Sequence, residues 1–262
     1  MNAATPKIRV RNLRKSFGEK LVLDGIDLDI MPGTSMVVIG GSGTGKSVLL
    51  KCILGLLEPD SGVIEIDGTD ILRLPRHERE AVRARIGMLF QNGALFDSLP
   101  VWENVVFRLL AQHRLRRAEG PERAADFLAQ VGLAASVGAL YPSELSGGMQ
   151  KRVALARAIA ARPDIMFFDE PTTGLDPRSR RVMWQIVKDL TRSGVTIFLT
   201  TQYLEEADQL ADNVAIIDSG RIVAEGTPDS LKSEIGNPHI QLQLADGSVA
   251  EAERACAEIG RL

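Results

Sequence analysis

A glycine-rich segment, GGSGTGKS, follows the apolar run SMVVI and precedes the helix-like stretch VLLKCILGLL. Glycines let the backbone curl so that several N–H groups and a helix N-terminus face one anion. The spacing matches G-x-x-x-x-G-K-[ST], in which the lysine reaches the β- and γ-phosphates and the hydroxyl ligates Mg²⁺. It predicts that a nucleoside triphosphate is bound, with Ser47 also on the metal, by Gly40, Gly41, Ser42, Gly43, Thr44, Gly45, Lys46 and Ser47.

Two acidic residues end a second apolar run, IMFFDE at Ile165–Glu170. The apolar residues predict a central strand, which leaves both carboxylates at its carboxyl end. Beside a phosphate site, Asp169 can hold Mg²⁺ through water, and Glu170 can act as a base that polarises an attacking water. A purely structural role for carboxylates at a strand end is the alternative.

A third segment, LSGGMQKR at Leu145–Arg152, places a serine and two glycines at a helix start. Such a start exposes N–H groups to an anion. A plain N-cap turn is the alternative, because serine is a common capping residue.

These residues need a framework that positions them. The strand-like runs lie at 7–18, 22–30, 35–40, 63–67, 164–170, 195–201 and 214–218. The helical patterns lie at 76–87, 103–160, 178–192 and 203–211. Strands that alternate with helices predict an α/β fold with a mostly parallel core sheet, here with an N-terminal antiparallel β layer and an inserted helical block.

The last residues have a different pattern. HIQLQLAD at 239–246 alternates like an exposed strand, and 248–262 reads as an amphipathic helix. One strand and one helix bury little alone, so this tail must dock or fray. We expect a main domain at 7–234 and a short β-α extension at 235–262.

The composition excludes several classes of protein. The formal net charge of −3, without a block of like charge, disfavours nucleic-acid binding. Two cysteines, Cys52 and Cys256, are too few for a disulfide framework and suit a reducing compartment. No leader-like segment opens the sequence, and no apolar run reaches the roughly 18–20 residues that span a bilayer. We expect a cytosolic protein without membrane insertion.

Together the motifs resemble those of the ATP-binding subunits of ABC transporters, in which LSGGQ is the defining motif; this chain has Met149 before Gln150. The resemblance covers about residues 7–231. It implies a P-loop NTPase of ABC type with a helical subdomain at about 92–160. It also implies a head-to-tail homodimer, in which Ser146, Gly147 and Gly148 of one subunit cover the ATP held by the other.

Further roles follow from the same resemblance. Gln91, in LFQNGALF, matches the Q-loop glutamine that contacts Mg²⁺ and water, and Phe17, in KSFG, matches the aromatic residue that stacks on adenine. Gly174, Leu175 and Asp176 match the D-loop. The respective alternatives are a solvated loop glutamine, a core phenylalanine and a simple turn.

Gln202, in LTTQYLEEAD, stands where most members have a histidine that contacts the γ-phosphate. Its amide can donate to phosphate, although it can never become cationic. We expect Gln202 to be a working catalytic switch, with Glu170 more important for the chemistry. A buried glutamine bonded to nearby backbone is the alternative.

The subfamily resemblance divides along the chain. Residues 36–176 look like Mla-type phospholipid-transport ATPases, whereas the sequence from Arg178 onward looks like daunorubicin-resistance-type drug exporter ATPases, which commonly have TTQYL. This division suggests a mosaic, natural or engineered, with a seam near the shared TTGLDP stretch.

The resulting prediction is a Mg²⁺-dependent ATPase on the inner face of the cell membrane. It would drive lipid or hydrophobic-compound transport through separate integral membrane permease subunits. One alternative is a soluble ABC ATPase acting on ribosomes or DNA, but those families usually have two ATP-binding halves or a long coiled-coil insertion. The other is an ATP-binding scaffold in which a mosaic interface impairs turnover.

Overall fold

The computed structural model describes residues 5–235, with side chains to Ser233. It divides into two compact units, Met1–Pro228 and Asp229–Leu262. The strand expected at 239–246 and the helix expected at 248–262 lie outside the described residues.

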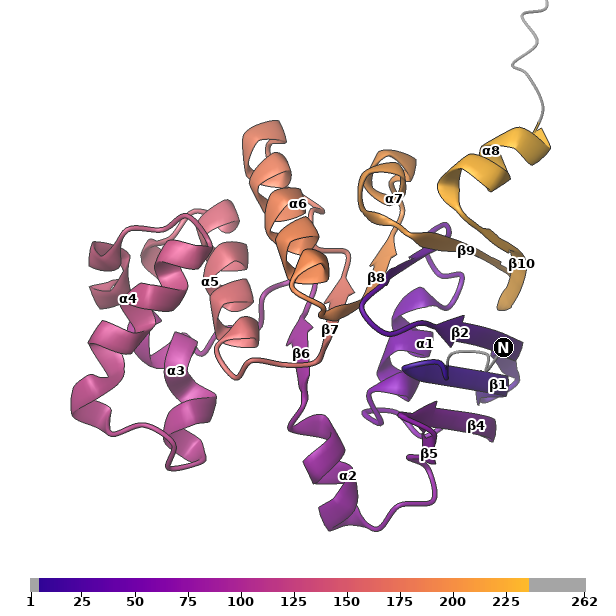
Figure 1. Cartoon of the computed structure of the whole chain (residues 1–262), viewed down its shortest axis with the longest axis horizontal. Coiled ribbons are helices and arrows are strands. Elements are labelled where there is room, and N and C mark those ends of the chain that lie inside the picture. Colours follow the sequence, from indigo (N-terminus) through magenta and orange to yellow (C-terminus); the bar gives the residue numbers. More distant parts are fainter. Residues whose placement is uncertain (1–4, 236–262) are drawn as a thin grey trace, which may run out of the picture. The chain divides into compact units, whose positions relative to one another are not determined.

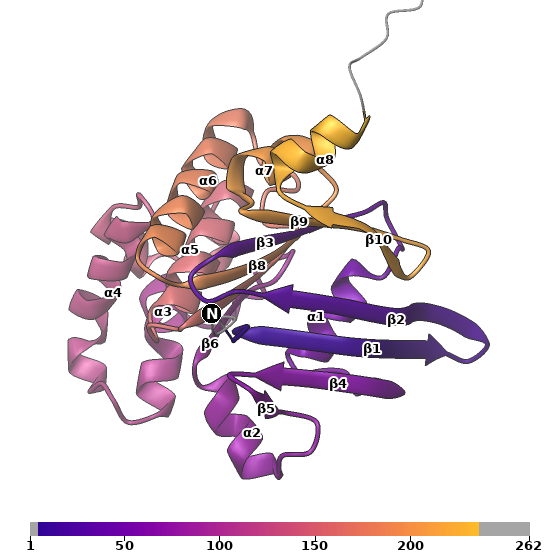
Figure 2. The same cartoon turned by 45° about the vertical axis from the view of Figure 1, so that its right-hand side comes forward.

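The N-terminal layer is an antiparallel sheet in the order β2-β1-β4-β5 (Figure 2). Its strands are β1 (Ile8–Phe17), β2 (Lys20–Ile30), β4 (Ser61–Ile66) and β5 (Thr69–Asp70). Ile8 pairs with Ile30 on one side and with Ile66 on the other. All three side chains are buried, because alternate residues of these strands face the core. The predicted β layer is confirmed.

The larger sheet has the order β10-β9-β3-β8-β7-β6. Its strands are β3 (Ser35–Ile39), β6 (Ile86–Leu89), β7 (Ile165–Asp169), β8 (Thr196–Thr201), β9 (Asn213–Asp218) and β10 (Arg221–Gly226). Every neighbouring pair is parallel except β9 and β10. All residues of β3, β7 and β8 are buried, which explains their unbroken apolar runs.

One predicted helix was too long. The pattern at 76–87 predicted a single helix, but α2 (Arg76–Arg83) ends first and Ile86 begins β6. The short run IGML pairs with β7, and this non-local pairing overrides the local pattern. The edge strand β10 was not predicted either.

The helices of the first unit form two groups. α3 (Val101–Ala111), α4 (Gly120–Gln130) and α5 (Gly147–Ile159) pack on one another, with short 3₁₀ turns at Arg117–Glu119, Ala135–Ala139 and Pro142–Glu144 (Figure 1). α6 (Pro177–Arg192) packs against α7 (Leu204–Leu210), and α1 (Lys46–Ile53) follows β3. α8 (Pro228–Ile235) begins at the last residue of the first unit, and its other residues are the described part of the second unit. No helix within residues 5–235 has the length and apolar character to cross a bilayer.

The main core lies between the two sheets and includes α1. Leu23 of β2, Leu49 of α1 and Phe198 of β8 are all fully buried in one cluster. The rings of Phe167 and Phe198 lie 5.4 Å apart between centroids, in a tilted arrangement. This packing fixes the carboxyl ends of β3, β7 and β8, which the chemically distinctive motifs follow.

Candidate active site

The site lies at the carboxyl ends of the neighbouring strands β3, β8 and β7. Ligands of open α/β sheets bind at this edge, because the loops that leave parallel strands meet there. A cavity of about 410 Å³ opens at this position. Predicted site residues that line it are Phe17, Ser42, Gly43, Gly45, Lys46, Ser47, Gln91, Glu170 and Gln202.

The glycine-rich loop has the geometry of a phosphate-binding turn. Gly45 has φ of 108° and is the N-cap of α1, where no side chain caps the helix. The first N–H groups of α1 are therefore available for an anion. Thr44 Oγ1 donates to Gly41 O at 3.0 Å, which closes the turn. Lys46 Nζ donates to Gly40 O at 2.8 Å and to Gly41 O at 2.9 Å.

The two predicted metal ligands from the P-loop and from β7 lie side by side. Ser47 Oγ donates to Asp169 Oδ1 at 2.9 Å, and Thr200 Oγ1 donates to the same oxygen at 2.8 Å. Within residues 5–235 no group of three His, Cys, Asp or Glu side chains forms a metal cage. Mg²⁺ typically binds through one or two protein oxygens together with substrate phosphates and water, so this pair fits Mg²⁺ delivered with a nucleotide.

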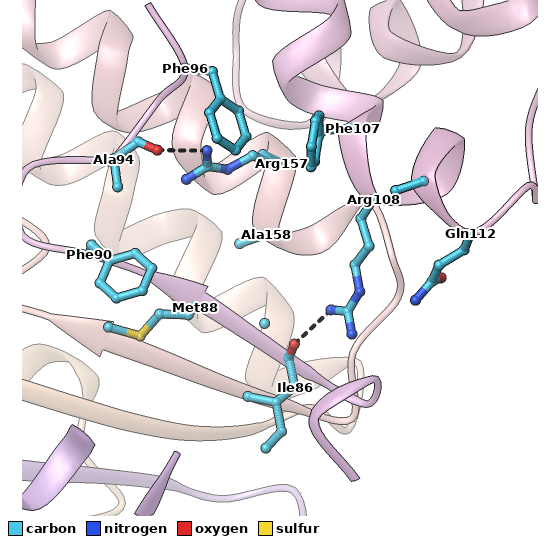
Figure 3. Close-up of a pocket in the computed structure, with 12 residues that line it drawn as sticks. Ile86, Met88, Phe90, Ala94, Phe96, Phe107, Arg108, Gln112, Arg157 and Ala158 are labelled. Carbon is cyan, nitrogen blue, oxygen red and sulfur yellow. Dashed lines mark hydrogen bonds between the residues drawn. The ribbon is translucent and has the colours of Figure 1, made fainter. Parts of the chain in front are cut away.

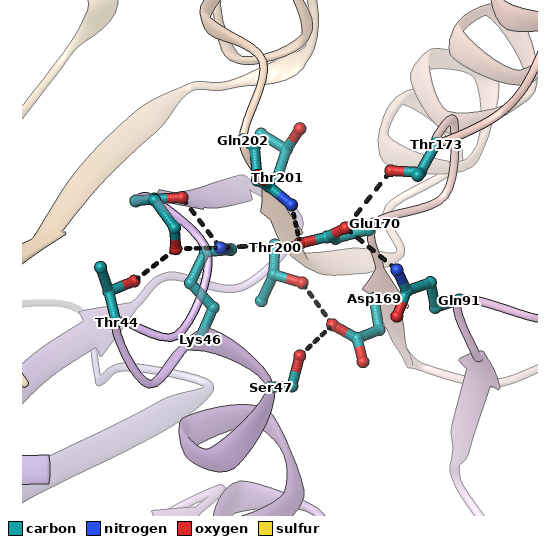
Figure 4. Close-up of polar contacts among 12 residues, drawn as sticks. Thr44, Lys46, Ser47, Gln91, Asp169, Glu170, Thr173, Thr200, Thr201 and Gln202 are labelled. Carbon is teal, nitrogen blue, oxygen red and sulfur yellow. Dashed lines mark hydrogen bonds and ion pairs between the residues drawn. The ribbon is translucent and has the colours of Figure 1, made fainter. Parts of the chain in front are cut away.

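Glu170 is the centre of a hydrogen-bond network (Figure 4). Gln202 Nε2 donates to its Oε1 at 2.9 Å, and Gln91 Nε2 donates to its Oε2 at 3.2 Å. Thr173 Oγ1 also reaches Oε2, at 3.3 Å, and Lys46 Nζ lies 3.6 Å from Oε1. The carboxylate is thus held by groups from four different loops or elements.

The backbone of Glu170 adopts a left-handed conformation with φ of 47°. A residue with a side chain is strained there by about 1–3 kcal/mol, and such strain clusters at functional sites. Its N–H donates to Thr200 O at 3.0 Å, which holds the turn against β8. The strained turn aims the carboxylate into the cavity.

The geometry decides two of the alternatives left open by the sequence. Gln202 is exposed and its amide donates to Glu170, so it is not a buried glutamine bonded to backbone. Gln91 is also exposed, and its amide donates to the same carboxylate. Phe17 is 49% exposed and lines the cavity, so it is not a core phenylalanine. Its stacking on adenine stays a prediction.

The LSGG segment lies apart from this cavity. Ser146 caps α5 by accepting the Met149 N–H at 3.3 Å, and Ser146 and Gly147 are exposed. Neither they nor Gly148 lines the cavity. The N-cap reading therefore holds within one chain, and a role in ATP binding would need a second copy.

The segment after Glu170 ends in a capped turn. Gly174 has φ of 77°, and the Asp176 carboxylate accepts the N–H groups of Arg178 and Ser179, each at 3.0 Å. The expected turn is present, and a further role in a subunit interface stays a prediction.

Sequence reasoning missed two threonines of the site. Thr200 fixes Asp169, and Thr173 orients Glu170. Thr200 had a weak signal: a polar residue at the end of an otherwise apolar buried strand needs a partner. Thr173 had none, because its contact depends on the turn that follows β7.

A comparison with known protein families decides the identity. Residues 23–173, more than half of the chain, match the family described as "ABC transporter". The chain belongs to the ABC transporter family.

Several ATP-binding proteins of this family are similar along most of the chain. Daunorubicin resistance ATP-binding protein DrrA3 of Streptomyces coeruleorubidus is 43% identical over 93% of this chain and 75% of its own length. DrrA of Streptomyces peucetius is 41% identical over 98% of this chain and 76% of its own. The methionine import protein MetN of Rhizobium johnstonii is 42% identical over 92% of this chain and 65% of its own.

Solved ABC structures have the same fold. A dimeric structure of MJ0796, a bacterial ABC transporter cassette, aligns with TM-score 0.79 and 30% identity over 84% of this chain and 98% of that one. A dimeric post-hydrolysis state of the same cassette, bound to ADP and Pi, aligns with TM-score 0.78 and 30% identity over the same shares. The predicted ABC-type fold is confirmed, and this ABC subunit is an ATPase.

The mosaic interpretation gains no support. The two daunorubicin-resistance relatives align across 93% and 98% of this ABC chain, which includes both sides of the expected seam at 176–178. The relatives described above act in drug resistance or methionine import, and none is of Mla type. The chain therefore reads as one continuous ABC subunit.

Proposed function

We propose that this ABC ATPase drives the export of a hydrophobic compound through separate permease subunits at the inner face of the cell membrane. One observation carries the motor function: Glu170 is held between Gln91 and Gln202, next to the Ser47–Asp169 pair and Lys46. This is the set of groups that hydrolysis of a terminal phosphate requires. The named drug-resistance relatives support the hydrophobic substrate.

Each residue of the site has a separate role in ATP hydrolysis. Mg²⁺, when bound with ATP, neutralises charge on the phosphate oxygens, and Ser47 and Asp169 would hold it. Glu170 accepts the proton of the attacking water, and the amides of Gln91 and Gln202 hold both of its oxygens in place. Gln202 contributes an uncharged N–H donor toward the terminal phosphate. Phe17 offers an exposed ring for the adenine base.

The ATP site would be completed by a second copy of the chain. Ser146, Gly147 and Gly148 present the exposed start of α5, and the N–H groups there suit the phosphates of an ATP bound to the partner. ATP stabilises the closed pair because it contacts both copies only in that state. The dimeric structures of a similar cassette support this arrangement.

A groove in the same unit offers a docking place for a permease segment (Figure 3). It has a volume of about 510 Å³ and lies between the β6 end, the segment after Gln91 and the helices α3 and α5. Phe96 and Phe107 are 43% and 40% exposed, with ring centroids 4.6 Å apart. The groove is lined by apolar side chains, Gln112 and two arginines, without an acidic residue.

The two arginines indicate the chemistry of that segment. Arg108 donates to Ile86 O at 3.0 Å, and Arg157 donates to Ala94 O at 2.8 Å. Burial lowers the pKa of each guanidinium, which favours a partner that returns negative charge. The groove fits a short helix with apolar side chains. Either an acidic residue of that helix or its C-terminal end would face the arginines. Phe90 precedes Gln91, and Ala94 follows it by three residues. A segment bound in the groove would therefore contact the loop that carries Gln91 and alter the Gln91–Glu170 hydrogen bond.

The motor function is tested by Mg·ATP hydrolysis at several protein concentrations. We expect the rate per chain to rise with concentration, because the site needs two copies. Glu170→Gln should abolish turnover, and Gln202→His should retain it. A rate per chain that stays constant with concentration would contradict the shared site, and a fully active Glu170→Gln would contradict the assignment of the base.

The substrate class is tested in inverted membrane vesicles that contain the chain and its permease. We expect ATP-dependent accumulation of daunorubicin or a similar amphipathic cation, absent with Glu170→Gln. If phospholipid moves and no drug accumulates, the proposed drug export is wrong and the transported substrate is a lipid. Phe107→Asp should prevent co-purification with the permease and leave ATP binding intact, because it places a charge in the apolar groove.

A further inference from the structure

A buried carboxyl group lies directly behind the Gln202–Glu170 pair. Glu206, on α7, is fully buried, although it follows Gln202 by only four residues. The indole of Trp184, on α6, donates to Glu206 Oε1 at 3.1 Å. None of the hydrolysis steps above uses this group, and a glutamate is almost never fully buried unless it is paired.

Polar groups from both catalytic segments face the same carboxyl. Burial raises the pKa of Glu206, while the hydroxyls of Thr201 and Thr172, the Trp184 indole and the Arg180 guanidinium act in the opposite direction. On α5, burial lowers the pKa of Lys151, and the charge of Glu206 opposes this. The net result is a raised pKa for Glu206, as expected where water is excluded.

This neighbourhood holds most of the unpaired buried side-chain atoms of the described residues. Of four such atoms, three lie here: Glu206 Oε2, Thr172 Oγ1 and Arg180 Nε, so the Thr172 hydroxyl faces Glu206 without a well-aligned hydrogen bond. A buried donor or acceptor without a partner raises the free energy of the fold, so such atoms are rare in native proteins. Both Thr172 and Arg180 act on Glu206, so the three atoms belong to one neighbourhood.

The network connects to both members of the catalytic pair. Thr201 precedes Gln202, and its Oγ1 accepts the N–H of Tyr203 at 3.0 Å. On the other side, Thr172 precedes Thr173, whose hydroxyl donates to Glu170 at 3.3 Å. Lys151 Nζ donates to Thr173 O at 2.5 Å and fixes that segment from α5. Glu206 therefore lies beside Thr201, which precedes Gln202, and beside Thr172, which belongs to the segment after Glu170.

We propose that Glu206 is a positioning residue for ATP hydrolysis, which braces the Gln202 and Glu170 segments against each other and against Trp184. It acts through length and hydrogen bonding, and it needs no negative charge. A displacement of about 1 Å at a reacting site can cost about 100-fold in rate, so a brace at this place affects turnover more than binding. The inference rests on ATP hydrolysis and is independent of the transported substrate.

The test compares kcat and KM for Mg·ATP in the full chain and its variants, with thermal melting measured beside them. Glu206→Ala should lower kcat about 10-fold to 100-fold with KM within about twofold, because the nucleotide contacts remain. Glu206→Gln should restore kcat to within about threefold of the parent, because glutamine has the same length and is uncharged. Glu205→Gln is the matched control: this neighbour has a 67% exposed side chain, and kcat should not change.

A second variant covers the case in which Glu206→Ala does not fold. Trp184→Phe removes only the indole N–H and should lower kcat about fivefold, the effect of one lost hydrogen bond, without raising KM. The proposal is overturned if Glu206→Gln is as damaging as Glu206→Ala, since the charge would then be required. It is equally overturned if Glu206→Ala or Trp184→Phe keeps full kcat, or loses activity only in proportion to its folded fraction.

Discussion

Gln202 Nε2 lies 2.9 Å from Glu170 Oε1, so the residue at the expected switch position is bonded directly to the carboxylate that we propose as the base. The two residues belong to loops that leave the adjacent parallel strands β8 and β7. A neutral amide donates a hydrogen bond to the carboxylate and does not titrate, whereas imidazole changes charge near neutral pH. If Gln202 is the switch, as we propose, it works through hydrogen bonding and without a change of charge.

Removing the Gln202 amide should slow hydrolysis. We expect Gln202→Ala to lower kcat by about 10-fold to 100-fold, because one preorganised donor at a reacting centre is commonly worth about that much or more. Gln202→His should retain hydrolysis within about fivefold and should add a fall in rate below about pH 6.5, where imidazole gains a proton. Steady-state rates between pH 5.5 and 8.5 measure both effects. A pH profile of Gln202→His identical to that of the parent would contradict this account.

Glu170→Gln should separate binding from chemistry. The amide keeps the size of the side chain but cannot accept the proton of the attacking water, so kcat should fall by about 100-fold to 10,000-fold. Nucleotide affinity should stay within about threefold, since a carboxylate does not attract phosphate and glutamine keeps the size of the side chain. Equilibrium binding of a fluorescent ATP analogue and steady-state hydrolysis are the two measurements. Lost affinity with kcat preserved would assign Glu170 to binding.

The motifs predicted many residues of the candidate site. The contacts between residues of different motifs could not be predicted from the sequence. Lys46 and Glu170 could be placed because a glycine-rich turn and a strand-end carboxylate have local signatures. The bond from Thr200 to Asp169 joins residues 31 positions apart, and only the pairing of β7 with β8 brings them together. Ile86 begins a strand for the same reason, since its pairing with β7 is non-local. Hydrophobic periodicity predicts the structure of a single segment, whereas these contacts depend on which two segments pair with each other.

The backbone of the phosphate loop should tolerate no added side-chain atom at Gly40. A Cβ there would lie 2.5 Å from Ile217 O and 2.7 Å from Thr44 Oγ1, so Gly40→Ala must displace β9 or the loop. We expect a stability loss of about 1–3 kcal/mol and weaker ATP binding. Gly41→Ala is the matched control, because its nearest contact would be an ordinary 3.8 Å. Chemical denaturation distinguishes the two, and equal losses of stability would contradict the steric explanation.

The exposed ring of Phe17 should affect affinity without affecting chemistry. Phe17→Ala removes an aromatic face at the cavity rim and should raise KM for ATP about 5-fold to 10-fold, which corresponds to about 1–1.5 kcal/mol of stacking. Phe17→Trp should preserve affinity. Leu21→Ala is the control, since Leu21 is similarly exposed at 48% but does not line the cavity. A changed kcat with unchanged KM would contradict the stacking role.

Cys52 should make the fold sensitive to alkaline pH. It is fully buried on α1, and burial raises the pKa of its thiol from 9.0 to about 11. A thiol with a raised pKa in the folded state contributes its full stability below pH 9. That contribution is lost as pH rises toward 11, because the unfolded chain ionises first. Between these values the free energy of unfolding should fall by at most about 1.4 kcal/mol per pH unit from this group. Denaturant titrations of the parent and Cys52→Ala at pH 8, 9, 10 and 11 measure the contribution of Cys52 to the free energy of unfolding. The difference between the two chains should shrink as pH rises, and a constant difference would show that Cys52 does not titrate in this range.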